Sequence, residues 1–308
     1  MQVAFQGRRL QLIDRPCNVC GSTKHRLIGS KRGALTSFDF QIVKCSDCRF
    51  VWVNPGLDDA SLMSLYDSDY YHGKGFDRFA TYLSGSNGVQ DHPCYASSDI
   101  ANRVSAAARR IGVRGKNLLD IGCGLGMLIK ELNMLGFQAC GLETSSFAAQ
   151  KCQSEGLEVL NAQLAEHPFG SRQFDIITMI EVIEHVPAPK TLLQQAAALL
   201  GPGGILYVQT GNVEHAFSFM RRLDHGLRRI RVLRDKRWNL RRALSPVMWD
   251  YFSLEGHVSY LAPGTLSLLY GQCGLETIQL PRSRNAGRFP RSLLWYKSMP
   301  VGRKPLMF

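Results

Sequence analysis

The 308-residue sequence contains no run of about 18 consecutive apolar residues, the length that a helix needs to cross a membrane. Its first 16 residues, MQVAFQGRRLQLIDRP, also lack the apolar core of a secretory signal. With 45% hydrophobic residues, the chain can still bury a core large enough for one large domain and a small module. The two absences predict a cytoplasmic protein without a transmembrane helix.

Acidic residues are scarce in one segment, and this imbalance accounts for most of the net charge of +12. Between Arg221 and Arg242, ten Lys and Arg residues are accompanied by only two aspartates. Apolar residues recur there at helical spacing, from Met220 to Leu233. A basic amphipathic helix predicts peripheral contact of residues 219–242 with the inner face of an anionic membrane, or a clamp for a diphosphate. A solvated charged lid is the alternative, because charge runs are usually solvated.

Nine cysteines are present, and four of them form two close pairs. Cys17 and Cys20 lie in CNVCG, and Cys45 and Cys48 lie in CSDCR. In a cytoplasmic chain such pairs favour a metal over a disulfide, and four cysteines typically close a tetrahedral structural zinc site. A module of about 60 residues also gains stability from a metal, since its own core is small. We predict a zinc-binding module over residues 1–56; a rubredoxin-like iron centre and a nucleic-acid-reading ribbon are the alternatives.

Residues 57–115 are predicted to form a helical linker and lid region. DDASLMSLY has the start signal and apolar spacing of a helix, and ASSDIANRVSAAARRIG has the pattern of an amphipathic helix. Between them lie three tyrosines, Tyr66, Tyr70 and Tyr71. These side chains either pack between the modules or form a lid over a ligand.

From residue 116 onward, strand-like runs alternate with helical segments. NLLDIG, QACGLE, FDIITMI and GILYVQT are the predicted strands. This alternation predicts parallel βαβ units, and therefore an α/β doubly wound sheet over residues 116–308, with the basic segment inserted at about 214–250. Ligands of such sheets bind at the carboxyl ends of the strands.

The sequence lacks the two common glycine patterns that bind phosphate. Gly122, Gly124 and Gly126 follow Asp120 at the end of the first predicted strand, with the spacing G-x-G-x-G. A dinucleotide site needs G-x-G-x-x-G, but Met127 occupies the last position, and the Gly-Lys-Ser/Thr of a P-loop is missing. The spacing disfavours a nicotinamide oxidoreductase, while the small residues still let the backbone approach a ligand.

Several segments, in the same order, resemble class I S-adenosylmethionine (SAM)-dependent methyltransferases. LLDIGCGLG is similar to their first motif, GLETS to the second, and FDIITMIEVIEHV and LLGPGGILYVQT to the later ones. EGHVSYLAPGTLSLLYGQCGL resembles the segment before their last hairpin, so the similarity spans roughly residues 116–280. The paired-cysteine module resembles that of methyltransferases from sugar, surface-glycan and natural-product pathways. The resemblance implies a Rossmann-like seven-stranded sheet, SAM as cofactor and methyl transfer as the activity.

The chemistry of SAM agrees with the residues present. The methionine part needs backbone N–H groups, carbonyls and an acid, which the glycine loop and Asp120 can supply, although Asp120 could instead cap the glycine turn. A carboxylate about 20 residues after the glycines usually accepts the ribose hydroxyls, and Glu143 has this position. The family pattern places Gln163, or the backbone of Leu164, beside adenine. The predicted cofactor-binding residues are Asp120, Gly122, Cys123, Gly124, Gly126, Glu143, Gln163, Leu164 and Ile180.

Methyl transfer needs an aligned acceptor, and a hydroxyl acceptor also benefits from a general base. EGHVSY supplies His257 and Tyr260, and similar sugar methyltransferases have a histidine near this point in the acceptor pocket. Glu181 is predicted to face the methyl group or the acceptor, whereas His185 is predicted to be structural. We predict His257, Glu181 and Tyr260 as catalytic residues; a histidine that only packs the segment is the alternative for His257.

The predicted function is methyl transfer to a small-molecule or glycan-like acceptor, such as a sugar or a nucleotide- or lipid-linked sugar. The sequence lacks the Asn-Pro-Pro-Tyr of many nucleic-acid amino-methyltransferases, which argues against base methylation. The alternative is a nucleic-acid-binding or RNA-modifying protein that uses the zinc module and the basic segment, whose binding would depend strongly on salt.

Overall fold

A computed structural model of the chain describes residues 1–5, 8–33, 36, 38–66, 68–72, 97–166, 168–211, 256–280 and 300–306. The predicted basic insertion at about 214–250 lies outside the described residues. The membrane or diphosphate contact of 219–242 therefore stays a prediction. Within the described ranges, no helix has both the length and the apolar character needed to span a membrane.

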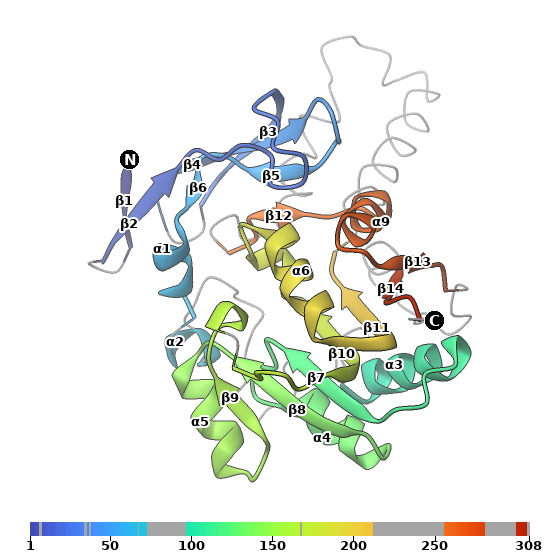
Figure 1. Cartoon of the computed structure of the whole chain (residues 1–308). Helices are drawn as coiled ribbons and strands as arrows, with labels where there is room; N and C mark the ends of the chain where they lie inside the picture. Colours follow the sequence, from blue (N-terminus) through green and yellow to red (C-terminus); the bar gives the residue numbers. More distant parts are fainter. Residues whose placement is uncertain are drawn as a thin grey trace, which may run out of the picture.

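A seven-stranded sheet forms the centre of the fold, in the order β13-β14-β11-β10-β7-β8-β9 (Figure 1). Its five parallel strands are β7 (Asn117–Ile121), β8 (Gln138–Glu143), β9 (Val159–Asn161), β10 (Phe174–Ile180) and β11 (Leu200–Gln209). The short strands β13 (Glu276–Ile278) and β14 (Val301–Arg303) complete one edge in antiparallel pairing. The predicted doubly wound seven-stranded sheet is confirmed.

Helices cover both faces of this sheet. One face packs against α3 (Ser97–Ile111), α4 (Met127–Met134) and α5 (Ser146–Ser154), and the other packs against α6 (Pro189–Leu199) and α9 (Pro263–Gln272). Successive side chains of a strand point to opposite faces of the sheet. Leu118 therefore packs in the core beneath α3, α4 and α5, and Leu119 packs in the core beneath α6 and α9. Because both faces are buried, the strands are mostly apolar, as the sequence indicated, and Asp120 and Thr178 are buried polar exceptions.

The N-terminal part contains two small sheets. Strands β1 (Gln2–Phe5), β2 (Arg8–Ile13) and β6 (Gly56–Leu57) form the first. The second contains a hairpin made by β3 (His25–Arg32) and β4 (Asp39–Cys45), followed by β5 (Val51–Val53). Two short helices, α1 (Asp59–Met63) and α2 (Ser68–Tyr71), lead away from it.

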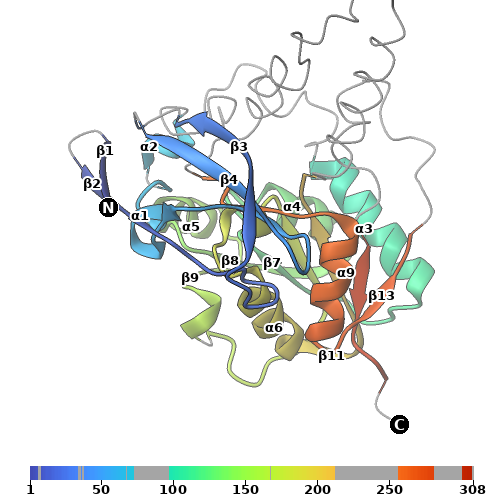
Figure 2. The same cartoon turned by 90° about the horizontal axis from the view of Figure 1, so that it is seen from above.

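One strand from the C-terminal half joins the second small sheet. β12 (Ser259–Tyr260) pairs antiparallel with β5, with Ser259 opposite Trp52 (Figure 1). Figure 2, seen from above, shows β3 and β4 in front of the strands of the main sheet. The two parts also share one apolar core, in which Trp52 belongs to the same cluster as Leu261. The predicted boundary at residue 56 therefore separates two parts of the sequence that pack against each other in the structure.

Candidate active site and cysteine cluster

The glycine loop connects the carboxyl end of β7 to α4. Gly122, Gly124 and Gly126 have positive φ values of 69°, 53° and 71°, which favour glycine. A Cβ at Gly122 would lie 2.6 Å from Cγ2 of Val182, whereas a Cβ at Gly124 would meet no atom within 4 Å. The loop thus packs at Gly122 against the segment that follows β10, whereas at Gly124 it leaves space for an approaching ligand.

The Glu143 carboxylate braces this loop from the end of β8. Its Oε2 accepts a hydrogen bond from the Gly124 N–H at 2.8 Å, and its Oε1 accepts one from the Ser145 N–H at 2.8 Å. Burial raises the pKa of Glu143, while these backbone N–H groups act in the opposite direction. Thr144 also donates to this carboxylate, through its backbone N–H and its hydroxyl, and both bonds likewise oppose the rise in pKa.

The Asp120 carboxyl is buried beneath the same loop. Its Oδ1 accepts a hydrogen bond from the Thr178 hydroxyl at 2.7 Å, across the β7–β10 pair. Burial raises the pKa of Asp120 to about 7, and the nearby Glu143 charge adds to the rise, although the Thr178 hydrogen bond opposes it. Asp120 therefore changes its charge near neutral pH, where an incoming cation could shift the balance.

Four further predicted cofactor residues lie at different depths. Cys123 is buried and packs against Gly141, where an added Cβ would lie 2.4 Å from its Sγ. Gln163 is exposed, whereas the Leu164 side chain is buried in the core at the start of the short helix η2 (Leu164–Glu166). Ile180 is half-buried at the end of β10. Of these side chains, only that of Gln163 presents polar groups to solvent.

The tyrosines after α1 pack between the N-terminal part and the main domain. Tyr70 and Tyr71 are buried in one apolar cluster with Leu12 of β2, and Leu125 of the glycine loop packs against that cluster. The Tyr71 ring also lies 5.8 Å from the ring of Phe147, at the start of α5. The packing interpretation is confirmed, and the same side chains cover the outer side of the glycine loop.

The acceptor side of the candidate site contains two adjacent histidines. After β10, Glu181 adopts a positive φ of 53°, and the helix η3 (Ile183–His185) follows. The rings of His185 and His257 have centroids 4.5 Å apart, and Tyr66 contacts the His185 ring edge-on at 5.8 Å. Sequence reasoning treated His185 as structural, yet the fold places it beside His257.

A backbone carbonyl determines which nitrogen of the His185 ring carries the proton. His185 Nδ1 lies 3.1 Å from the Gly256 carbonyl oxygen, which can only accept, so Nδ1 carries the proton. In the neutral ring, Nε2 then holds the lone pair that a general base uses. Glu184 offers a carboxylate oxygen within 4.8 Å of ring nitrogens of both histidines. Tyr260, the third predicted catalytic residue, is buried in the tyrosine cluster described above.

Three polar residues that sequence reasoning missed are buried around β11. Neither amide atom of Gln209, nor the Thr210 hydroxyl, has a hydrogen-bond partner within the described part of the chain. Arg103 of α3 likewise has a buried Nη2 without a partner among the described residues, and its charge acts on the buried Tyr207 phenol. Buried polar groups are rarely unpaired, which makes these side chains candidates for ligand contacts. In the sequence, Gln209 and Thr210 stand out only as the polar end of the apolar run GILYVQT.

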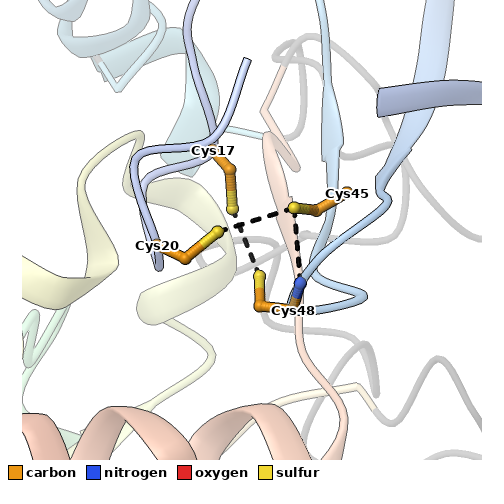
Figure 3. Close-up of side chains that lie close together, drawn as sticks. All are labelled: Cys17, Cys20, Cys45 and Cys48. Atoms are coloured by element: carbon orange, nitrogen blue, oxygen red, sulfur yellow. Dashed lines mark hydrogen bonds between the residues drawn. The ribbon is translucent and has the colours of Figure 1, made fainter. Parts of the chain in front are cut away.

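The four paired cysteines converge in a separate cluster (Figure 3). The Sγ atoms of Cys17 and Cys48 are 3.4 Å apart, those of Cys20 and Cys45 are 3.6 Å apart, and all four lie within 4.8 Å of one another. Tetrahedral zinc with Zn–S bonds of about 2.3 Å separates sulfurs by about 3.8 Å, so the arrangement fits such an ion.

The two cysteine turns have the same backbone form. Positive φ values follow the second cysteine of each pair, 75° at Gly21 and 68° at Arg49. The N–H groups of Cys17 and Cys45 donate to the carbonyls of Ser22 and Phe50, respectively. Burial alone would raise the pKa of Cys45, but the N–H groups of Cys48 and Asp47 lower it to about 7. Such backbone donors favour the thiolate that a metal requires.

Comparison with known proteins assigns the main domain. Residues 94–280, more than half of the chain, match a methyltransferase domain family. The chain belongs to this family. A magnesium protoporphyrin IX methyltransferase from Synechocystis PCC 6803, solved with bound S-adenosylhomocysteine (SAH), shares the fold: its TM-score is 0.50 at 15% identity, over 77% of this chain and 97% of that one.

Curated relatives include two ubiquinone biosynthesis O-methyltransferases. The protein from Nitrosococcus oceani is 37% identical over 119 residues, which cover 36% of this chain and 50% of that protein. The protein from Xylella fastidiosa is 31% identical over 166 residues, which cover 49% of this chain and 65% of that protein. The chain thus spans between half and two thirds of the length of these relatives. The predicted methyltransferase family is confirmed, while the resemblance to sugar and glycan enzymes stays a prediction.

Proposed function

We propose that this methyltransferase-family protein transfers the methyl group of SAM to a hydroxyl group of a small-molecule acceptor. The observation that carries this proposal is the contact between Gly122 and Val182. It brings the glycine loop against the segment that leads to His185, so a cofactor site and a histidine pair border one another. When bound, SAM supplies an electrophilic methyl group on a sulfonium ion.

The cofactor side would use residues of β7, β8 and α3. The Gly124 backbone and the Asp120 carboxylate would hold the methionine part, and Glu143 would accept the ribose hydroxyls. Arg103, whose Nε donates to the Asp99 carbonyl, would direct its buried Nη2 to the methionine carboxylate. Gln163, or the backbone of Leu164, would contact adenine. Cys123, Gly126 and Ile180 would shape the walls.

The raised pKa of Asp120 predicts that cofactor affinity depends on pH. At pH values below about 7 the carboxyl is protonated, so binding an ammonium group must first remove that proton. We expect the affinity for SAH to increase about tenfold between pH about 6 and about 8, with proton release on the acidic side. Calorimetry in two buffers with different ionisation enthalpies measures both quantities. Asp120→Asn should give a flat profile, and a flat profile for the wild type would contradict the proposed contact.

The acceptor side would use His257 and His185 as a pair. As the acceptor oxygen bonds to the methyl carbon and the carbon–sulfur bond breaks, the hydroxyl proton passes to an imidazole Nε2. Glu181, at the junction after β10, would orient the acceptor. The buried amide of Gln209 and hydroxyl of Thr210 would give further polar contacts to it. Tyr260 would support this wall from β12.

A change of His257 to glutamine tests the proposed base. Turnover should decrease about 100-fold, since positioned bases commonly contribute about this much, while SAH affinity should stay within about twofold. His25→Gln is the control for a histidine outside this pair, because His25 is exposed on β3, where it bonds to the Thr23 carbonyl and contacts the Trp52 ring edge-on. Unchanged turnover in His257→Gln would favour the alternative that this histidine only packs its segment.

The acceptor class is tested by a screen with methyl-labelled SAM. One set contains phenolic acceptors, in line with the ubiquinone biosynthesis relatives, and the other contains free, nucleotide-linked and lipid-linked sugars, in line with the cysteine module. We expect an O-methylated product in one set. A methyl group found on nitrogen or carbon by mass spectrometry would contradict the proposal.

The four-cysteine cluster would hold one structural zinc ion through Cys17, Cys20, Cys45 and Cys48. Their close sulfurs and paired turns support this assignment. A site closed by four thiolates has no open coordination position, so the ion would stabilise the fold and take no part in the reaction.

A further inference from the structure

The first cysteine turn contacts the histidine segment of the main domain. Asn18 lies between the ligand candidates Cys17 and Cys20, and its side-chain amide donates a hydrogen bond to the Pro187 carbonyl. Pro187 follows His185 by two residues. A side chain held inside one metal turn thus fixes the backbone immediately beyond the first histidine.

The strand that follows the second cysteine turn contacts the other histidine segment. Cys48 leads within three residues into β5, which pairs with β12. The Val53 N–H donates to the Val258 carbonyl at 3.0 Å. Val258 is the residue directly after His257, so the strand attached to this turn fixes the backbone beside the second histidine.

The two histidine segments are in turn bonded to each other. The Val258 N–H donates to the Glu184 carbonyl at 2.9 Å, and the Ser259 hydroxyl donates to the Val186 carbonyl at 2.9 Å. His185 Nδ1 reaches the Gly256 carbonyl at 3.1 Å. Residues 183–187 and 256–259 therefore form one hydrogen-bonded unit, with one metal turn attached to each half.

The cofactor side has a different construction. The hydrogen bonds that shape it join Gly124 to Glu143 and Thr178 to Asp120, all within β7, β8, β10 and their loops. The two cysteine turns contribute none of these bonds. Loss of the metal should consequently loosen the two histidine segments more than the glycine loop.

We infer that the four-cysteine centre positions His185 and His257, so that metal binding sets the geometry of the acceptor side and leaves SAM binding intact. The inference rests on the proposed function for the identity of the metal and the role of the histidines. It makes Asn18 a positioning residue that acts through the Pro187 carbonyl.

Asn18→Asp tests this positioning with the metal centre kept. The carboxylate has nearly the same shape but cannot donate to the carbonyl, and Thr23→Asp adds the same charge to an exposed position of the same turn. Amide-resolved hydrogen exchange should accelerate at least about fivefold at His185 and Val258 in Asn18→Asp, and stay unchanged at Gly122 and Gly124. The imidazole carbon resonances of both histidines should shift, while SAH affinity stays within about twofold.

Metal removal by a chelator, followed by addition of zinc, gives the second measurement. The same amides should exchange faster in the stripped protein and recover with zinc. Uniform acceleration in both experiments, or no change at His185 and Val258 in Asn18→Asp, would overturn the inference, as would a purified protein that contains no metal. Absence of SAH binding in the wild type would instead refute the proposed cofactor, because the exchange data do not depend on it.

Discussion

Replacement of Glu143 by alanine is expected to weaken SAH binding at least about 100-fold, the largest single effect at the cofactor site. The side chain would supply charge-assisted hydrogen bonds to the ribose hydroxyls. It also accepts the N–H groups of Gly124 and Ser145, which would lose their partner in the glycine loop. The loss of the ribose contacts acts only on the bound state, whereas the loss of the two N–H partners also loosens the free glycine loop. We therefore expect a large decrease in affinity and a smaller decrease in the stability of the fold.

Calorimetric titration with SAH measures this effect, with NAD as a ligand that should not bind. Glu158→Ala is the matched control, because Glu158 is an exposed carboxylate just before β9 that pairs with Arg172 at the surface. Glu143→Gln should lie between wild type and Glu143→Ala, since its amide nitrogen would face a backbone N–H group. Affinity of Glu143→Ala within about threefold of the wild type would refute the ribose assignment.

Replacement of Cys45 by serine is expected to remove the metal and to lower the melting temperature by about 10 °C. Structural zinc sites contribute about 10–16 kcal/mol of binding free energy in small modules, and a loss of about 5 kcal/mol in a chain of this size gives such a shift. The effect should extend beyond the N-terminal part, because Cys45 is buried in the same core as the strands of the main sheet.

Metal analysis and thermal unfolding of purified protein check this expectation. Cys273→Ser is the matched control, because Cys273 is half-buried at the end of α9 and lies outside the cluster. We expect one zinc ion per chain in the wild type and none in Cys45→Ser. Wild-type metal content and melting temperature in Cys45→Ser would contradict a four-cysteine site, and iron in the wild type would favour the rubredoxin-like alternative.

Much of the architecture is encoded locally, which is why the sequence predicted it. The glycines after Asp120 need positive φ within one turn, and Glu143 ends the neighbouring strand only 19 residues after Gly124. The backbone hydrogen bond that closes each CxxC turn is local, from Cys17 to Ser22 and from Cys45 to Phe50. Alternating strands and helices of these lengths admit a parallel sheet with both faces covered. The family match then agrees with the order of these local patterns.

The sequence by itself therefore determined the sheet, the glycine loop with its carboxylates and the four cysteine positions. Only the tertiary structure decided which distant side chains meet. His185 and His257 are brought together by the return of the chain to the end of β10, and Asn18 reaches Pro187 across 169 residues. Such contacts depend on the order of strands in the sheet and on a two-residue strand, β12, too short to have a periodicity of its own. The sequence alone does not connect the cysteine module to the two histidine segments; the Asn18 side chain and the β5–β12 pairing join them.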